Sequence, residues 1–338
     1  MFLYLCFRNE NNLLVNCSSI DKLKIGDKLG HGWQKEVYAG EIYGRKVVVK
    51  VILYQGAQYK MCRDKSKSTE FCYNFSYLAA LNEIVLNYQL KHRGIVKLMG
   101  YCVKDVHHTP NPHDPILKRG VLTVFELGRP FKLEKTLNST GRLQLAFDLA
   151  DVLDYLEYSP IGSVYSVDLR PSNLVIIDGH LKISDMEGSF SKEPRCGNHM
   201  TCSYGVKCME GECIGSNARA MMSRAKPIFQ ALLKPSHSDR IFKKNLTTLY
   251  STLHKESISA AQLKSDIKSL LEKSQKLVTT NDWSLYWTID SLDQWSLSRD
   301  ILYNVSSIYA SFNSYCYWFL LFVLLLFIFN VNCTTSTY

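Results

Sequence analysis

Apolar residues in the first 126 positions follow a pattern that is typical of strands separated by glycine turns. The pattern predicts five strands, at about 22–29, 35–43, 45–53, 96–103 and 121–126. Tyr43-Gly44 lies between two of these segments and predicts a tight hairpin turn. After the third strand, Leu78, Leu81 and Val85 recur at helical spacing and predict a helix over 77–90. Five strands with one helix after the third indicate a small β-rich lobe.

Helical periodicity dominates the middle of the chain. One apolar stripe predicts a long helix that ends at Ser159-Pro160, and it comprises Leu143, Ala146, Phe147, Ala150, Leu153 and Leu156. Asp178-Gly179 then separates two short apolar runs, 175–177 and 181–183, and predicts a second hairpin. Further helices are predicted near 216–233, 239–253 and 259–277, the last beginning with the capping box Ser259-x-x-Gln262. The expected fold class is therefore α+β, with a mainly helical second lobe.

Hydrophobic content and net charge indicate a globular protein that does not bind nucleic acid. The 338 residues carry a formal net charge of +9, and 46% of them are hydrophobic, which suffices for a complete core. The positive charge is diffuse, with no run of five basic residues and no nucleic-acid-binding motif in the sequence. We therefore expect no nucleic-acid partner.

Cysteine usage indicates the cellular compartment. Eleven cysteines, several of them clustered, are typical of an oxidising environment. Six Asn-x-Ser/Thr sequons agree with this interpretation, although chance alone supplies some of them: Asn16, Asn74, Asn138, Asn245, Asn304 and Asn332. The expected location is the secretory pathway, in the lumen of the endoplasmic reticulum or Golgi, or the extracellular space.

The two ends of the chain leave several interpretations open. Met1 to Phe7 is a weak export signal because only seven apolar residues precede Arg8, so we expect a truncated or misassigned start. Residues 315–329 form an apolar run of fifteen, fewer than the roughly 20 that span a bilayer as a helix. This run is interpreted as a short membrane anchor, a glycolipid-anchor signal or an error in the gene model. Membrane association through 315–329 is thus one possible outcome.

The turn between the first two predicted strands gives the first indication of phosphate chemistry. It contains Gly30 and Gly32, and glycine lets backbone N–H groups approach phosphates closely. Alone, such a glycine pair is more often structural than functional. The third strand, however, ends with Val47-Val48-Val49-Lys50, and an inward lysine requires a charged partner. Glu83 on the following helix is the predicted partner, although an exposed strand end and a solvated helix face explain each residue singly.

The strongest motif lies around the second hairpin. Asp168 and Asn173 are five residues apart in the loop before it, and Asp185 ends it seventeen residues after Asp168. Phosphoryl transfer requires these residue types: one carboxylate orients the hydroxyl group and accepts its proton, and an amide oxygen and a second carboxylate hold a divalent metal ion. Any one of the three is explained as a loop-capping residue, but the ordered set is not.

At these motifs the sequence resembles protein kinases. Among them it looks most like the secreted tyrosine-protein kinases of the vertebrate lonesome kinase type, within the divergent secretory-pathway group. The resemblance rests on residues 30–38, where Lys35 replaces the third loop glycine, on 159–171 and on 178–182. Cysteine positions agree too: Cys62, Cys72, Cys102, Cys196, Cys202, Cys208 and Cys213. The similarity covers roughly residues 21–275.

The resemblance implies a bilobal protein-kinase-like fold that binds ATP with Mg or Mn. It implies that Lys50 contacts the nucleotide with Glu83 as its ion-pair partner, and that Asp168 is the catalytic base. Asn173 and Asp185 would ligate the metal. The remaining nucleotide-binding positions are Gly30, Gly32 and Val37 in the loop, and Glu126 and Leu127, which open the hinge whose main chain would take the adenine.

The implied domain boundaries follow from these motifs. We expect an N-terminal tail at 1–20, an N-lobe at 21–126 and a C-lobe at 127–278, which contains a cysteine-rich activation segment at 186–215. Residues 279–338 form a divergent tail.

Three departures from the kinase pattern keep alternatives open. Ser166-Val167 replaces the usual His-Arg before the catalytic aspartate, so regulation by loop phosphorylation is not expected. Asp185-Met186-Glu187 replaces Asp-Phe-Gly and adds a carboxylate, and the Ala-Pro-Glu motif is absent from the sequence. The expected activity is ATP-dependent phosphorylation of secreted or lumenal proteins that have accessible tyrosines. The alternatives are a pseudokinase or nucleotide-binding scaffold, and a disulfide-rich interaction domain tethered to a membrane.

The cysteine clusters favour disulfides. Cysteines 196, 202, 208 and 213 lack the Cys-x-x-Cys spacing of structural zinc sites, and they allow three disulfide pairings. A bridge between Cys62 and Cys72 would close a loop before the helix that contains Glu83, and we expect it to hold that helix in an active position.

Overall fold

The structure is a computed structural model. It describes residues 13–53, 56–65, 67–104, 115–118, 120–132, 138–197, 200–235, 243–253 and 258–279. The apolar run 315–329 and the predicted tail 279–338, apart from Thr279, lie outside these residues. Within the described part of the chain, no helix is both long and apolar enough to cross a bilayer.

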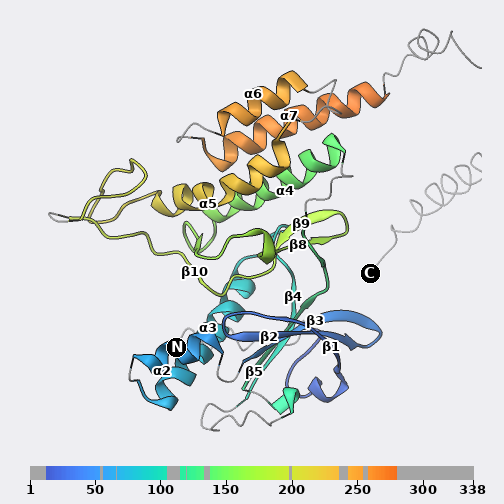
Figure 1. The fold of residues 1–338 in the computed structure, drawn as a ribbon, viewed down its shortest axis with the longest axis vertical. Helices are drawn as coiled ribbons and strands as arrows, with labels where there is room; N and C mark the ends of the chain where they lie inside the picture. The colour runs from blue at the N-terminus through green and yellow to red at the C-terminus, as the bar shows by residue number, and fades with distance from the viewer. Residues whose placement is uncertain are drawn as a thin grey trace, which may run out of the picture. The chain divides into compact units, whose positions relative to one another are not determined.

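The N-terminal part contains one antiparallel sheet of five strands in the order β1-β2-β3-β5-β4 (Figure 1). The strands are β1 (Lys24–His31), β2 (Lys35–Ile42), β3 (Arg45–Ile52), β4 (Leu98–Val103) and β5 (Val121–Glu126). Tyr43 and Gly44 both have positive φ, 49° and 74°, so the β2–β3 hairpin has the turn that the sequence predicts. All five predicted strands are thus confirmed, with small shifts of their ends.

Two helices pack beside this sheet, where the sequence predicted one. Helix α3 (Thr69–Gln89) is longer than the predicted 77–90, and the short helix α2 (Ala57–Asp64) precedes it. The Ser68 hydroxyl caps α3 by accepting the backbone N–H of Phe71 at 3.1 Å. Phe71, Phe75 and Leu78 are more than half exposed, so apolar residues lie on both faces of the helix and conceal its period.

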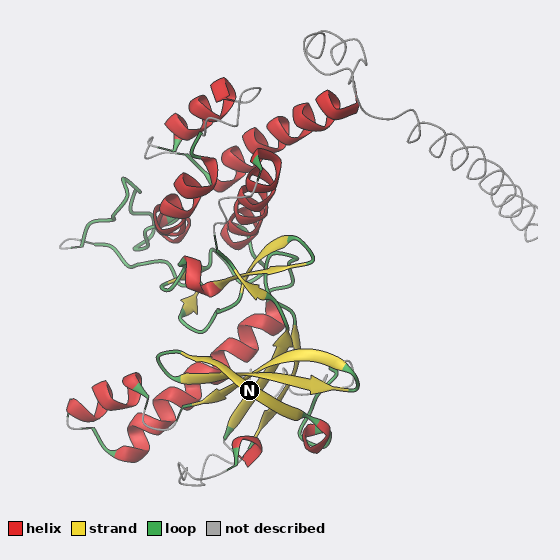
Figure 2. Cartoon of the chain, turned by 45° about the vertical axis from the view of Figure 1, so that its right-hand side comes forward, coloured by secondary structure: helices red, strands yellow, loops and turns green. Residues whose placement is uncertain are grey.

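The C-terminal part is mainly helical (Figure 2). Its helices are α4 (Ser139–Glu157), α5 (Ser216–Leu233), α6 (Lys243–Thr252) and α7 (Ala260–Thr279). The predicted stripe on α4 is buried, apart from the partly buried Phe147, and packs into the main core with Phe229 and Leu263. Ser259 caps α7 by accepting the backbone N–H of Gln262 at 3.1 Å.

Short strands and 3-10 helices connect these helices to the sheet. The hairpin β8 (Leu174–Ile177) and β9 (His180–Ile183) turns at Asp178-Gly179, where both residues have positive φ as predicted. The remaining elements are β6 (Arg129–Pro130), β7 (Tyr165–Ser166), β10 (Ser189–Phe190), and the 3-10 helices η2 (Ile20–Lys22), η3 (Ile116–Lys118) and η4 (Pro171–Asn173). The predicted α+β class is confirmed.

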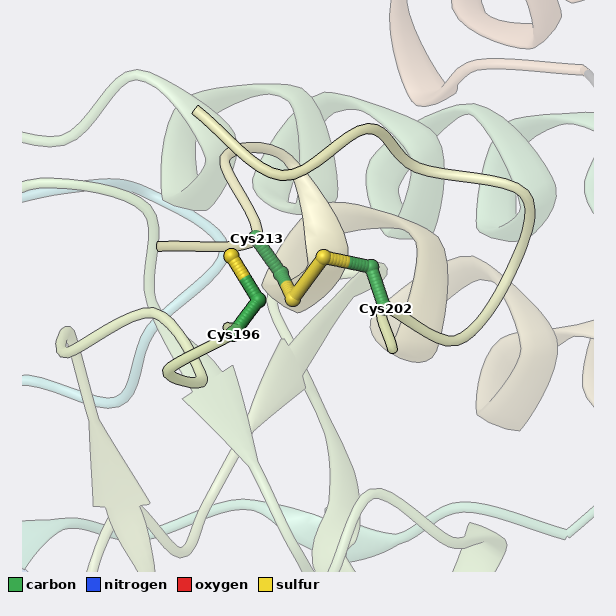
Figure 3. Close-up of side chains that lie close together, drawn as sticks. All are labelled: Cys196, Cys202 and Cys213. Atoms are coloured by element: carbon green, nitrogen blue, oxygen red, sulfur yellow. A yellow bond between two sulfur atoms is a disulfide. The ribbon is translucent and has the colours of Figure 1, made fainter. Parts of the chain in front are cut away.

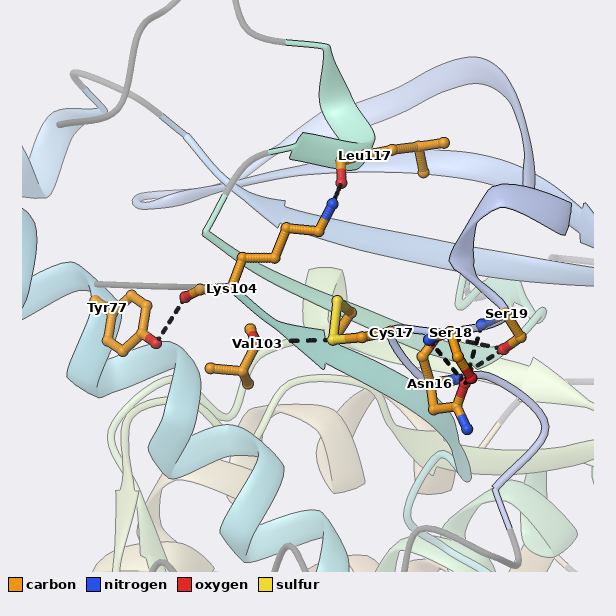
Figure 4. Close-up of a disulfide and its surroundings, with 9 residues drawn as sticks. Asn16, Cys17, Ser18, Ser19, Tyr77, Val103, Lys104 and Leu117 are labelled. Carbon is orange, nitrogen blue, oxygen red and sulfur yellow. Dashed lines mark hydrogen bonds between the residues drawn. A yellow bond between two sulfur atoms is a disulfide. The ribbon is translucent and has the colours of Figure 1, made fainter. Parts of the chain in front are cut away.

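Residues 13–20, which we expected in a tail, pack against β4. Val15 is fully buried and forms a parallel β-bridge with Gly100. A Cβ atom at position 100 would lie 2.2 Å from the Val15 carbonyl oxygen, so this close contact requires glycine. A disulfide between Cys17 and Cys102 attaches the segment covalently, and Asn16 Oδ1 accepts the N–H groups of Ser18 and Ser19 beside it (Figure 4). The spacing of the cysteines does not predict a pair between Cys17 and a cysteine 85 residues away.

Three further disulfides lie in the described residues. Cys62 on α2 bonds Cys72 on α3, as predicted. In the activation segment the pairs are Cys196–Cys208 and Cys202–Cys213, one of the three possible arrangements. The sulfur atom of Cys196 lies beside the Cys202–Cys213 bridge, and the sulfur atoms of Cys196, Cys202 and Cys213 are within 4.8 Å of one another (Figure 3).

Removal of the α2–α3 bridge is expected to loosen the start of α3. Replacing Cys62 and Cys72 with alanine should lower the free energy of unfolding by about 3 kcal/mol, because the bridge closes a short loop in the unfolded chain. The melting temperature should fall by about 6–12 °C. Hydrogen exchange in the first turns of α3 should accelerate more than in α4. Unchanged exchange in α3 would show that the bridge does not hold the helix.

A cluster of charges joins the loop after α3 to α4 and α7. Asp151 accepts hydrogen bonds from Arg93 Nε and Lys264 Nζ, both at 2.9 Å, and lies 3.3 Å from His92 Nε2. Burial opposes ionisation of Asp151, but the hydrogen bonds from Lys264 and Arg93 outweigh it and hold the pKa of this carboxyl below its usual range. The ionised form of Asp151 is therefore stabilised by folding.

Stability should consequently depend on Asp151 in a pH-dependent way. Because the pKa is lower in the folded state, the contribution is complete above the unfolded value of about 3.9 and is lost as the pH falls through the folded value. Asp151→Asn should cost about 1–2 kcal/mol at pH 7, a modest figure because Arg93 is 56% exposed and water screens the pair. Urea denaturation should show this difference shrinking towards pH 3. A difference that is independent of pH would contradict the assignment.

Candidate active site

A buried ion pair joins the sheet to α3. Lys50 on β3 lies 2.7 Å from Oε1 of Glu83, whose side chain is fully buried. The Lys50 ammonium also donates to the Ser184 carbonyl at 2.8 Å and lies 4.8 Å from the centre of the Phe125 ring. Lys50 and Glu83 are therefore close together, as predicted. Ser184, in the segment after β9, contacts Lys50 as well.

A second lysine, which the sequence motifs do not place in the site, shares the same glutamate. Lys35 on β2 lies 2.5 Å from Oε2 of Glu83 and 3.2 Å from Oε1 of Glu187. Burial opposes the charged form of Lys35, but Glu83, Glu187 and Asp185 outweigh it and raise the pKa of Lys35 well above its ordinary value. The two oxygens of Glu83 therefore hold one ammonium each.

The strand register explains how both lysines reach one carboxylate. Lys35 pairs with Ile52 and Val37 pairs with Lys50 across β2 and β3. Side chains two residues apart in a strand share a face, so Lys35 and Lys50 are diagonal neighbours on the face covered by α3. Val37, a predicted nucleotide-binding residue, lies on the same face, opposite Lys50 and two residues from Lys35.

Two acidic residues follow β9 at the same place. Asp185 Oδ1 accepts the backbone N–H of Glu187 at 3.0 Å. Burial opposes ionisation of Asp185, but Lys50 and Lys35 outweigh it and lower the pKa of the carboxyl. Burial, with Glu83 and Asp185 nearby and Lys35 opposing, raises the pKa of Glu187 to about 7. Asp185 thus stays ionised in conditions where Glu187 exchanges its proton.

The third acidic group, Asp168, lies in the loop before β8. Its Oδ2 atom accepts a hydrogen bond from Asn173 Nδ2 at 2.7 Å and lies 2.9 Å from the Arg170 guanidinium. Pro171 at the start of η4 fixes the turn that brings Asn173 back to Asp168. The Asp168 side chain is 42% exposed, whereas Glu83 is buried. An incoming hydroxyl group could therefore reach Asp168.

Backbone contacts join this loop to the segment that contains Asp185. The Asn173 carbonyl accepts both the N–H of Ser184 at 2.9 Å and its hydroxyl at 3.0 Å. Asn173 therefore touches Asp168 through its side chain and the residue before Asp185 through its main chain. Lys50 thus interacts directly with Glu83 and Asp185, and Asn173 with Asp168. The two sets are joined through Ser184, whose carbonyl accepts from Lys50 and whose N–H donates to Asn173.

The other predicted nucleotide positions lie in β1, in the turn after it and at the end of β5. Gly30 is near the end of β1, where an added Cβ atom would meet nothing within 4 Å. Gly32 is in the turn to β2, where an added Cβ atom would meet only the Lys35 carbonyl at 3.9 Å. Glu126 ends β5, and its carboxylate accepts from Lys182 Nζ at 2.7 Å and from the Lys97 N–H at 2.8 Å. Leu127 follows it and is 38% exposed. The Glu126 side chain therefore has structural partners.

The activation segment is fixed by contacts at both ends. Val167, at the position of the usual arginine, packs against Gly188. The backbone N–H of Val167 donates to the Gly188 carbonyl. Glu193 accepts the N–H groups of Gly215 and Asn217 at the start of α5. These contacts and the two disulfides hold the segment 186–215 that the sequence predicts as an activation segment.

Known proteins similar to this chain are protein kinases. The extracellular tyrosine-protein kinase PKDCC of Homo sapiens is 26% identical over 232 residues, which are 65% of this chain and 45% of that protein. Wall-associated receptor kinase-like 18 of Arabidopsis thaliana is 30% identical over 169 residues, 48% of this chain and 18% of the relative. The probable serine/threonine-protein kinase drkD of Dictyostelium discoideum is 28% identical over 167 residues, 49% of this chain and 11% of the relative.

These comparisons confirm the resemblance that the motifs indicate, and the fold is kinase-like. The chain spans less than half the length of each of these relatives. No protein-family model matches it.

Proposed function

We propose that this chain is a divergent protein kinase of the secretory pathway that transfers the γ-phosphate of ATP to protein hydroxyl groups, with tyrosine as the acceptor. The observation that carries the proposal is the convergence of Lys50, Glu83 and Asp185 at one place, although they come from three separate elements. A buried lysine held by a buried glutamate is the arrangement that phosphoryl-transfer sites use to place phosphates. The similarity to protein kinases supports the same activity.

In this proposal each residue has one task. Lys50, kept extended by Glu83, would hold the α- and β-phosphates, and the turn with Gly30, Gly32 and Val37 would cover them. Asp168 would orient the acceptor hydroxyl and take its proton, while Arg170 beside it would offset negative charge. The main chain at Glu126 and Leu127 would take the adenine.

The metal-binding residues suit magnesium or manganese. Asn173 donates its amide nitrogen to Asp168, so its Oδ1 atom would be the one to ligate a cation, and Asp185 would contribute an ionised carboxylate. Amide and carboxylate oxygens are the hard ligands that Mg²⁺ and Mn²⁺ prefer. A bound metal ion would neutralise the charge that develops on the phosphates during transfer.

Two features support the proposed compartment and acceptor. The described residues contain four disulfides, which persist in oxidising compartments. The human relative is named as extracellular and as a tyrosine-protein kinase. The boundaries 21–126 and 127–278 for the two lobes, and 186–215 for the activation segment, are part of the same proposal.

A pseudokinase is the second candidate, and Lys35 and Glu187 are the observations that favour it. Both groups lie at the lysine–glutamate pair, and Lys35 occupies the Glu83 oxygen that Lys50 does not use. A site with this additional charge could bind nucleotide without transferring phosphate.

Labelling with γ-³²P-ATP separates the two candidates. Secreted, oxidised protein with Mn²⁺ or Mg²⁺ should label a Glu-Tyr copolymer, and acid hydrolysis should release phosphotyrosine. EDTA should abolish labelling. A thermal shift with ATP and Mn²⁺ but no labelling of tyrosine, serine or threonine substrates would establish the pseudokinase, and the absence of both responses would refute a nucleotide site.

A further inference from the structure

Two departures from the kinase pattern form one ion pair. Lys35 stands where the loop normally has its third glycine, and Glu187 stands where the Asp-Phe-Gly motif has its glycine. They are 152 positions apart in sequence, yet Lys35 Nζ lies 3.2 Å from Glu187 Oε1. Both side chains are nearly buried, with 7% and 12% of their surface exposed. Either substitution alone would bury an unpaired charge, whereas the two together form a buried ion pair.

Lys35 reduces the excess of negative charge at this place. Glu83, Asp185 and Glu187 supply three carboxylates, and Lys50 alone supplies one ammonium. An uncompensated carboxylate at Glu187 would repel the phosphates of a nucleotide held by Lys50, and the repulsion would be strong because little water enters. Lys35 forms ion pairs with both Glu83 and Glu187, so its ammonium offsets the negative charge that Glu187 adds to the site.

The pair also connects two parts of the fold. Lys35 belongs to β2 in the five-stranded sheet, and Glu187 begins the activation segment after β9. Asn82 on α3 donates to the carbonyls of Glu187 and Ser189 at 3.4 and 3.3 Å, next to the same connection. The start of the activation segment is thus held against β2 and α3 by groups that need no modification.

From these contacts we propose that Lys35 and Glu187 form a permanent latch that positions the start of the activation segment and keeps the site electrostatically able to accept nucleotide phosphates. The latch rests on the proposed nucleotide site and extends it. It takes the place of the arginine that would read a phosphorylated loop, whose position is occupied by Val167. Lys35 is a positioning residue in this account, and its effect on nucleotide passes through Glu187.

The account predicts that one substitution rescues another. Lys35→Met leaves Glu83, Asp185 and Glu187 with Lys50 as their one ammonium, and in assays at alkaline pH, where Glu187 is ionised, should lower kcat/KM for the Glu-Tyr copolymer about 10- to 100-fold and raise the KM for ATP. Adding Glu187→Gln removes one of these three acids, so at the same pH the double variant should recover at least about 10-fold over Lys35→Met. Lys35→Arg should keep most of the activity because it keeps the ammonium's charge. The control Lys24→Met removes an exposed lysine of neighbouring β1 and should change neither parameter.

Binding measurements keep the test independent of catalysis. The thermal shift with ATP and Mn²⁺ should shrink in Lys35→Met and return in the double variant, and the melting temperature without nucleotide reports whether each variant folds. If the two substitutions add without rescue, in kinetics and in ATP binding alike, the latch is refuted and Lys35 contacts the phosphates itself. If the wild type transfers no phosphate but ATP binding follows the rescue pattern, the latch holds and only the kinase proposal fails.

Discussion

Asp168→Asn is expected to lower the rate of phosphate transfer by about 10²- to 10⁴-fold, the range for loss of a general base. The substitution keeps the size of the side chain and one oxygen for the contact with Asn173 Nδ2. It removes the charge that would accept the hydroxyl proton. Because Asp168 is 42% exposed, its loss should cost little stability, so the decline in rate will report on chemistry.

Single-turnover labelling with saturating ATP and Mn²⁺ measures this effect directly, and the thermal shift with nucleotide should be kept. Asp178→Asn is the matched control, because Asp178 is an exposed turn residue with φ of 51°, a conformation that asparagine adopts readily. Activity within threefold of the wild type in Asp168→Asn would exclude Asp168 as the base.

Glu83→Gln is expected to impair both stability and activity. The Glu83 carboxylate is fully buried and holds Lys50 on one oxygen and Lys35 on the other. Removing its charge leaves two buried ammoniums with less compensation, and breaking a buried ion pair costs about 3–5 kcal/mol. Urea denaturation should show this loss, and the melting temperature should fall by about 6–20 °C.

Activity should decrease by at least about 10²-fold in the same variant, since Lys50 is no longer held where it would meet phosphates. The assay must be run below the lowered melting temperature. Glu70→Gln, an exposed glutamate in the first turn of the same helix, should change stability by less than about 1 kcal/mol and leave labelling intact. Equal effects of the two substitutions would mean that the buried contacts of Glu83 carry no special role.

Local signals in the sequence predicted most of the fold. The two hairpin turns follow from Tyr43-Gly44 and Asp178-Gly179, because few other residue pairs accept positive φ twice in succession. The stripe on α4 follows from a period that one buried face imposes. Helix α2 was missed because it is short and mostly polar, with Gln58 its one buried residue.

The site was predicted less completely, since pairing depends on contacts between distant segments. Lys50 and Glu83 were identified because their spacing matches the kinase motifs. Lys35 was considered only as a replaced glycine, although strand alternation places it on the same face as Val37 and therefore near Lys50. That period of two was the signal that could have found it. The partner of Glu187 had no such local signal.

The interleaved bridges of the activation segment bear on how this protein can be produced. Cys196 pairs past Cys202 to Cys208, and Cys202 pairs past Cys208 to Cys213, so each loop encloses one end of the other. Of the three ways to join these four thiols, the two non-crossing ones would each give a differently folded segment. A bacterial cytoplasm would leave the thiols reduced, and rapid air oxidation of such material would trap mispaired molecules. Recombinant protein for every assay above should therefore be secreted from eukaryotic cells, where disulfide exchange can correct the pairing before export.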